Sequence, residues 1–146
     1  MDAYSVNKKA SFDYEILETV EAGIALLGFE VKAVRKGFAS LAGSFAIIRG
    51  GEAYLVNGAI PPYQPGNTPK EYDPTRTRKL LLTKDEIKEL VGKTEKTGLT
   101  LVPLKLYNKR GKIKLELGLA RHKKKHDKRE TIKRRETERE MKRFAA

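Results

Sequence analysis

The chain has 146 residues, 39% of them hydrophobic, and its 31 Lys and Arg exceed its 19 Asp and Glu, which gives a formal net charge of +12. This length allows a single hydrophobic core, and the charge predicts an anionic partner, with RNA or DNA first and an anionic membrane surface or an acidic protein as alternatives. The absence of cysteine excludes disulfides, thiolate chemistry and Cys-ligated zinc.

The start of the chain predicts a hairpin after a polar leader. Residues 1–11 are polar and basic, and we expect the first few of them to be mobile. Residues typical of strands fill Phe12 to Val20 and Ile24 to Leu27. The segment Glu21-Ala22-Gly23 between them therefore predicts a turn.

A short helix and a second hairpin follow. Val31 and Val34 are three residues apart and Gly37 comes soon after, which predicts a two-turn helix over residues 30–36. Apolar-rich runs at residues 43–49 and 52–60 are joined by two glycines, which tolerate the positive φ angles of a tight turn. This pattern predicts a β-hairpin.

The middle of the chain predicts a long loop and then a well-marked helix. Pro61 to Arg76 contains five of the six prolines, and proline removes a backbone donor and fixes φ. Thr83 and Glu86 have the spacing of a capping box, so we expect a helix to start there. Its apolar stripe is Ile87, Leu90 and Val91, and we expect Gly92 to end it.

The last predicted hairpin joins residues 99–107 to residues 112–119. In its second strand Ile113, Leu115, Leu117 and Leu119 alternate with polar residues, which predicts one core face and one face open to a ligand. Pro103 predicts an edge or a bulge in the first strand.

These elements favour a mainly β fold: a small, partly open antiparallel barrel of the oligonucleotide-binding (OB) type with two or three short helices. We expect residues 1–119 to form the barrel and residues 120–146 to form a basic tail, which carries +7 of the net charge. The only apolar side chains of any size in the tail are Ile132, Met141 and Phe144, and they form no continuous stripe. The tail should therefore be disordered alone and ordered by a polyanion.

A basic stretch before the second helix is the first candidate binding site. Arg76, Arg78 and Lys79 would place donors for phosphate oxygens at the rim of the sheet. Tyr63 and Tyr72 are nearby in sequence and are candidate stacking faces for bases. The alternative interpretation is a solvated charged edge that deters strand pairing.

No group of residues predicts catalysis or metal binding. Gly92-Lys93-Thr94 lacks the glycine that a phosphate-binding loop carries five positions earlier, where Ile87 stands. His122 and His126 are four residues apart, but they lie among cations with no third ligand close by. We therefore expect no enzyme activity, no metal and no cofactor.

Several short segments form an ordered series along the chain: Glu21-Ala22-Gly23, Glu30-Val31-Lys32, Gly51 to Leu55, Asp73 to Leu82, Gly98 to Leu104, Gly118-Leu119-Ala120 and Asp127-Lys128-Arg129. In content and order this series resembles the SsrA-binding protein family, also called small protein B, from about Asn7 to Arg129. The resemblance implies an OB-type barrel that holds the tRNA-like domain of transfer-messenger RNA. With alanyl charge and elongation factor Tu, that RNA is brought to ribosomes stalled without a stop codon, and the protein itself is no enzyme.

The resemblance also implies functional positions. Those facing RNA on the barrel are Asn7, Glu21, Leu81, Thr83 and Lys114, followed after the last strand by Arg121, Lys123, Lys124 and Lys125. Those placed in the decoding centre and the empty mRNA channel of the ribosome, where the tail becomes helical, are His126, Asp127, Lys128, Arg129, Ile132, Met141 and Phe144. Three positions depart from common family residues: Thr83, His122 and Thr137.

Two alternatives carry the same charge. A general ribosomal or rRNA-binding protein of the OB type would need no Asp127-Lys128-Arg129 motif. A peripheral membrane protein could use the tail as a basic anchor, but Met141 and Phe144 offer little apolar area to insert. No apolar run approaches ~18 residues and no signal peptide opens the chain. We therefore expect a soluble, cytoplasmic, monomeric RNA-binding protein with no membrane partner.

Overall fold

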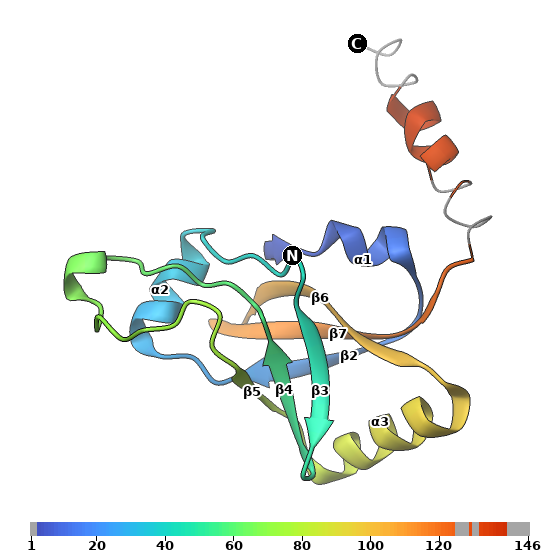
Figure 1. The fold of residues 1–146 in the computed structure, drawn as a ribbon, viewed down its shortest axis with the longest axis horizontal. Coiled ribbons are helices and arrows are strands. Elements are labelled where there is room, and N and C mark those ends of the chain that lie inside the picture. The colour runs from blue at the N-terminus through green and yellow to red at the C-terminus, as the bar shows by residue number, and fades with distance from the viewer. Residues whose placement is uncertain (1–2, 125–128, 130–131, 140–146) are drawn as a thin grey trace.

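The computed structural model describes residues 3–124, 129 and 132–139, and its main feature is one antiparallel sheet (Figure 1). The sheet has seven strands in the order β1-β6-β7-β2-β5-β4-β3. The strands are β1 (Ala3–Val6), β2 (Tyr14–Ile24), β3 (Phe45–Arg49), β4 (Glu52–Val56), β5 (Arg78–Leu81), β6 (Thr100–Lys109) and β7 (Lys112–His122). The helices are α1 (Lys8–Asp13), α2 (Gly28–Arg35) and α3 (Lys84–Thr97), and η1 (Pro65–Asn67) is a 3₁₀ turn.

The sheet curls on itself, which confirms the predicted mainly β, antiparallel fold. Ala46 and Ile48 of β3, at one end of the strand order, pack near Leu101 of β6 and Leu119 of β7, and Leu90 of α3 covers this contact. A barrel that is partly open results. Its main core lies between the curled strands, and α2 contributes Ala33 and Val34 to it.

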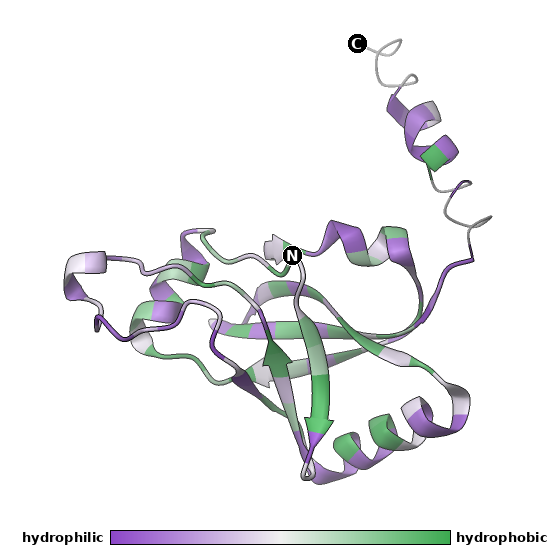
Figure 2. Ribbon diagram, viewed as in Figure 1, coloured by the Kyte–Doolittle hydropathy of each residue, from purple (hydrophilic) through white to green (hydrophobic). Residues whose placement is uncertain are grey.

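The alternation predicted in β7 is confirmed. Leu115, Leu117 and Leu119 are 0–1% exposed, whereas Lys114, before the first of them, and Glu116, between the first two, are half-buried. Figure 2 shows the same alternation of apolar and polar residues along the central strands. Removing such leucines from water stabilises the fold by about 1.5–3 kcal/mol each. The polar face of β7 therefore lies outside the core, where Glu116 forms an ion pair with Lys105 at 3.8 Å.

The turn predicted at Glu21-Ala22-Gly23 is wrong, because these residues continue β2. They pair in register with Glu116, Leu115 and Lys114 of β7. Ala22 is 1% exposed and belongs to the core. The glycine serves close packing between strands, since a Cβ at position 23 would lie 3.0 Å from the Cβ of Leu81.

The sequence interpretation also left out β1 and α1, which fall in the polar leader. The side chain of Asn7 caps α1 by accepting a hydrogen bond from the Ala10 N–H at 3.3 Å. Its backbone N–H donates to the Leu104 carbonyl at 2.8 Å, which ties the leader to β6. A capping side chain and an edge-strand pairing thus order a segment whose composition indicates mobility.

The helices follow the predicted caps with one exception. Gly37 has a φ of 81° just after α2, as expected. The capping box between Thr83 and Glu86 starts α3, also as expected. The predicted stop at Gly92 is wrong: α3 continues to Thr97 and ends at Gly98, whose φ is 67°. A glycine inside a helix costs only about 1 kcal/mol, and the packing of α3 on the barrel offsets it.

Of the three predicted hairpins, the second (β3–β4) and the third (β6–β7) are confirmed. Gly50 and Gly51 have φ angles of 60° and 76° and join β3 to β4. The register between β6 and β7 shifts between Pro103 and Lys105, where a bulge was expected. Of the described tail, residues 132–139 are helical and all exposed, and Figure 2 shows that most of this segment is hydrophilic. Among the described residues, no helix is long and apolar enough to cross a bilayer.

Candidate RNA-binding surface

The outward face of the central strands carries a row of four residues that pair across the sheet. Lys114 of β7 is paired with Tyr107 of β6 on one side and with Gly23 of β2 on the other, and Gly23 is paired with Leu81 of β5. Leu81 is 54% exposed although it is a large apolar residue. The row thus sets an apolar side chain and a lysine on either side of a glycine.

Glu21 lies on the same face, two residues before Gly23. Its carboxylate accepts a hydrogen bond from the Tyr107 hydroxyl at 2.5 Å and from the Lys109 ammonium at 3.1 and 3.2 Å. The Tyr107 hydroxyl, and then Lys109, lower the pKa of Glu21 below its ordinary value, so it is ionised at neutral pH. An oriented carboxylate on a basic protein suits the N–H and 2′-hydroxyl donors of RNA.

Tyr107, a member of the row, orients Glu21 through its hydroxyl. It is 3% exposed, and burial together with its hydrogen bond to Glu21 raises its pKa. The ammonium of Lys105 lies 5.5 Å from the centroid of its ring. Sequence reasoning missed Tyr107 and Lys109. The signal available for Tyr107 was its place on the predicted strand opposite Lys114, whereas Lys109 fell in the predicted connection between the two strands.

The other two positions expected to face RNA on the barrel, Asn7 and Thr83, have capping roles. Asn7 caps α1 and also donates from Nδ2 to the Pro103 carbonyl at 2.9 Å, so it lies at the β1–β6 edge, away from the row. The Thr83 hydroxyl accepts from the Glu86 N–H at 3.2 Å, two residues after Leu81. The structure therefore brings Glu21, Leu81 and Lys114 together and leaves Asn7 apart.

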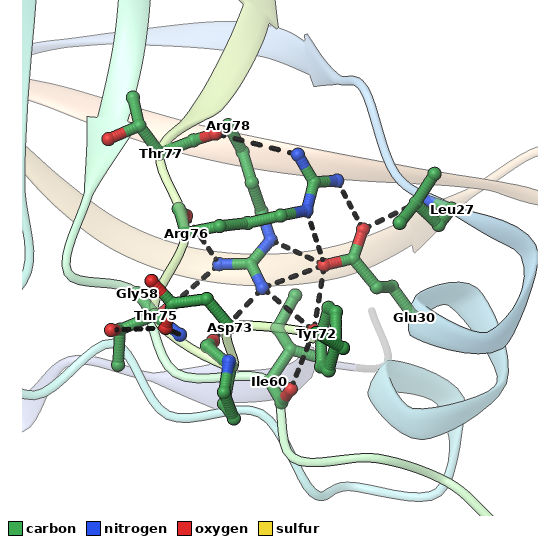
Figure 3. Close-up of polar contacts among 11 residues, drawn as sticks. Leu27, Glu30, Gly58, Ile60, Tyr72, Asp73, Thr75, Arg76, Thr77 and Arg78 are labelled. Carbon is green, nitrogen blue, oxygen red and sulfur yellow. Dashed lines mark hydrogen bonds and ion pairs between the residues drawn. The ribbon is translucent and has the colours of Figure 1, made fainter. Parts of the chain in front are cut away.

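The basic stretch before α3 divides between the inside and the outside of the barrel. Arg78 is 0% exposed, and its guanidinium binds the Glu30 carboxylate, which is also 0% exposed, at 2.7 and 2.9 Å (Figure 3). The prediction that Arg78 contacts RNA is therefore wrong, because its donors are enclosed. Arg76 remains partly exposed, but its guanidinium is also committed to Glu30. Lys79 points outward, 48% exposed, with Glu52 at 3.4 Å.

Glu30 is the centre of this buried cluster. Burial alone would raise its pKa, but hydrogen bonds from Arg76, the Leu27 N–H, Arg78 and Tyr72 outweigh burial and lower it to about 2. Burial and the hydrogen bond to Glu30 raise the pKa of Tyr72 to about 12. The Tyr72 ring makes a T-shaped contact with Phe29, with centroids 4.7 Å apart, and its hydroxyl is bound to Glu30, so Tyr72 is held in the buried cluster.

The basic stretch after β7 leaves the barrel beside the start of β2. Arg121 is exposed and forms an ion pair with Glu15 at 2.6 Å. The His122 ring lies 4.3 Å from that of Tyr14, and the Lys123 N–H donates to the Asp13 carbonyl at 2.9 Å. The chain is thus fixed to the barrel as far as Lys123. Lys124 follows and is exposed.

Part of the predicted tail site lies outside the described residues: Lys125, His126, Asp127, Lys128, Met141 and Phe144. Arg129 and Ile132 are described, and both are helical and exposed. Arg135 reaches α1, where its guanidinium lies 5.7 Å from the Phe12 ring centroid. Within the described part of the chain, no group of three His, Asp or Glu side chains could hold a metal ion.

Comparisons with known proteins agree on one family. The family model described as "SmpB protein" matches residues 4–146. An SsrA-binding protein from Thermosynechococcus vestitus is 57% identical over 95% of this chain and 91% of its own length. One from Enterococcus faecalis is 53% identical over 94% of this chain and 88% of its own. A solved chain described as "tmRNA-SmpB: a journey to the center of the bacterial ribosome" is 52% identical, with a TM-score of 0.66 over 87% of this chain and 92% of that one.

Proposed function

The chain belongs to the SmpB family of SsrA-binding proteins, and from this premise we propose that it binds transfer-messenger RNA and delivers it to stalled ribosomes. The observation that carries the proposal is a match along nearly the whole chain, tail included, to proteins named for binding SsrA RNA. The solved relative, described with that RNA and the ribosome, supports the same partners. The net charge of +12 suits both.

In this proposal the outward face of the sheet holds the tRNA-like domain of the RNA. Lys114 and Lys79 supply positive charge for phosphates, and Glu21 and Leu81 supply an acceptor and an apolar contact between them. Asn7 and Thr83 contribute by shaping the backbone at the edges of this face. Arg76 is partly exposed, but we propose that its main role is to bind the Glu30 carboxylate.

The basic stretch after β7 and the tail extend the contact from the barrel to further RNA and to the ribosome. Arg121, Lys123, Lys124 and Lys125 extend the RNA contact beyond the barrel. Residues from His126 onward, including the Asp127-Lys128-Arg129 motif, Ile132, Met141 and Phe144, enter the decoding centre and the mRNA channel, lined by small-subunit rRNA. The helical segment at 132–139 supports this, since its residues are all exposed and only Arg135 among them is described as reaching the barrel. The tail's disorder when free stays a prediction.

The protein performs no chemistry of its own in this proposal. It acts as a monomer in the cytoplasm, in a delivery complex with elongation factor Tu and alanine-charged RNA. Peptide tagging then follows from the ribosome's own activity once the RNA is accepted. A general rRNA-binding protein is the alternative function, and it differs in the RNA that it retains.

Sequencing of the RNA that copurifies with the tagged full-length chain from cells tests the proposal. We expect the fraction of transfer-messenger RNA in the copurified RNA to be much higher than its fraction in total cellular RNA. The double variant Glu21→Ala, Lys114→Ala should lose most of this enrichment. Broad recovery of rRNA fragments without transfer-messenger RNA would instead support the general rRNA-binding protein.

A truncation tests the separate role of the tail. A chain ending at Lys124 keeps every described strand, α1, α2 and α3. It should retain most of its affinity for the tRNA-like domain and lose peptide tagging on stalled ribosomes. Tagging at the full-length rate by this chain would show that the tail has no part in delivery.

A further inference from the structure

The proposed function makes no use of the buried cluster around Glu30. Its carboxylate binds the guanidinium groups of Arg76 and Arg78 and accepts from the Tyr72 hydroxyl at 2.8 Å (Figure 3). A buried ion cluster of this kind adds little net stability, because desolvation offsets much of the attraction, and a gain in structural specificity is the alternative explanation. Such a cluster fixes the relative position of the segments that contribute to it.

The cluster joins α2 to the proline-rich loop between β4 and β5. Arg78 donates to the carbonyls of Gly58, at 2.7 Å, and of Pro74, at 3.0 Å. The Tyr72 hydroxyl, whose single proton Glu30 and the Ile60 carbonyl share, lies 2.8 Å from that carbonyl oxygen, and the Ile60 N–H donates to the Pro74 carbonyl. Both ends of the loop are therefore held to each other and to the helix. Loops held in one conformation by a scaffold commonly carry binding residues.

A groove of about 310 Å³ lies where this loop meets the start of α2. Its lining includes Phe29, Lys32, Tyr63, Gln64, Asn67 and Thr68. Phe29 belongs to the wall on the helix side, and its ring packs edge-on against Tyr72, which is itself bound to Glu30. The buried cluster thus sets the position of one wall of the groove directly.

The groove has the components that single-stranded RNA requires of a protein. Phe29 and Tyr63 contribute aromatic rings to the lining, and each has one ring neighbour, Tyr72 at 4.7 Å and Phe38 at 6.4 Å between centroids. Aromatic rings are the groups on which bases stack. Gln64 and Asn67 carry amide groups, a group that can pair with base edges, and the Asn67 Nδ2 donates to the Gln64 Oε1 at 2.8 Å, which leaves the Gln64 Nε2 and the Asn67 Oδ1 at the groove. Lys32 is the only charged residue among those described as lining the groove. Lys36 follows one turn later on the same helix face and is also exposed. The local charge is therefore positive, which favours a polyanion over a peptide.

We propose that this groove binds an unpaired nucleotide of RNA, with the base stacked on Tyr63 and Phe29 and a phosphate on Lys32. The site would be a second RNA contact, in addition to the outward sheet face. The loop and the tail leave the barrel at opposite ends (Figure 1). The nucleotide comes either from transfer-messenger RNA or from rRNA, and both present the same chemistry. The inference adds a contact to the proposed function.

Affinity measurements with two RNA targets test the site. The full-length chain and the variants Tyr63→Ala and Lys32→Ala are titrated against the labelled tRNA-like domain and against purified ribosomes. We expect each variant to lose about tenfold in affinity for one of the two targets. The target affected identifies the source of the nucleotide. Tyr63→Phe keeps the ring and should bind within about twofold of the unchanged chain.

Two further measurements make the result decisive. Lys88→Ala removes an exposed lysine from α3 and controls for the loss of one charge. Thermal unfolding of each variant controls for the fold, and Lys32 is the cleaner position because its side chain is exposed. Unchanged affinity of Tyr63→Ala and Lys32→Ala for both targets would overturn the proposal, as would a loss matched by Lys88→Ala. A photo-crosslinker at position 63 that captured ribosomal protein and no RNA would also overturn it. If the unchanged chain failed to bind the tRNA-like domain at all, the proposed function would fail instead.

Discussion

Arg78 and Lys79 are neighbours in β5 with the same charge and opposite surroundings. Arg78 points into the barrel and is enclosed with Glu30, whereas Lys79 points outward and is 48% exposed. Successive side chains of a strand lie on opposite faces of the sheet, so adjacent cations divide between structure and binding. A basic stretch that forms a strand therefore divides into an inner set of structural cations and an outer set that is open to a ligand.

The largest expected effect is on the inner set. Glu30→Gln removes the negative charge that Arg78 and Arg76 share and leaves Arg78 buried without a counter-charge. We expect a loss of about 3–5 kcal/mol in the free energy of unfolding, measured by urea denaturation. Glu52→Gln, which removes the exposed partner of Lys79, is the matched control and should change stability far less. Equal losses of unfolding free energy for Glu30→Gln and Glu52→Gln would contradict the distinction between inner structural charges and outer exposed ones.

The second prediction concerns acid. The pKa of Glu30 falls from 4.5 to about 2 on folding, so its contribution is fully present above pH 4.5 and is lost as pH falls toward 2. The shift corresponds to roughly 3 kcal/mol. The stability difference between the unchanged chain and Glu30→Gln should therefore shrink between pH 5 and pH 2. A constant difference over that range would contradict the assignment.

The third prediction concerns the outer set. Lys114→Ala should weaken binding of the tRNA-like domain by about tenfold and reduce the salt dependence of log Kd by about one. The unfolding temperature should stay nearly unchanged, because Lys114 lies on the outward face. Lys88→Ala on α3 is the control for loss of one positive charge. A parallel loss of stability and binding would assign Lys114 to structure.

The smallest effect is expected for the stability of Lys79→Ala. Its ion pair with Glu52 spans 3.4 Å between side chains that are both more than 40% exposed, and exposed pairs of this kind contribute about 0–1 kcal/mol. We expect the free energy of unfolding to change by at most about 0.5 kcal/mol. A loss as large as that of Glu30→Gln would mean that the outer cations are structural too.

The sequence predicted what local chemistry determines. The two glycines between β3 and β4, the capping box at Thr83 and the alternation of β7 all depend on residues close together in the chain, and all are confirmed. Family resemblance brought Glu21, Leu81 and Lys114 together, and the strand registers place them on one face. Local signals were sufficient for the hairpin turn, the capping box and the strand alternation.

The wrong predictions concern residues whose conformation or burial depends on a partner far away in the chain. Glu30 is 48 residues from Arg78, so nothing near the arginine indicated that a carboxylate would enclose it. Glu21-Ala22-Gly23 has turn composition, but pairing with β7 keeps it extended, and the glycine admits Leu81. Tertiary contacts thus override local preference at these two sites.

Directed cleavage of RNA tests the central claim that the outward sheet face holds the tRNA-like domain. Because the chain has no cysteine, one introduced cysteine carries an iron chelate at a single position. Ala25→Cys places it on the exposed residue two positions after Gly23, and Lys88→Cys places it on α3 as the control. We expect hydroxyl radicals from position 25 to cut the tRNA-like domain at one localised set of nucleotides and those from position 88 to cut it weakly. Stronger cleavage from position 88 than from position 25 would contradict the account.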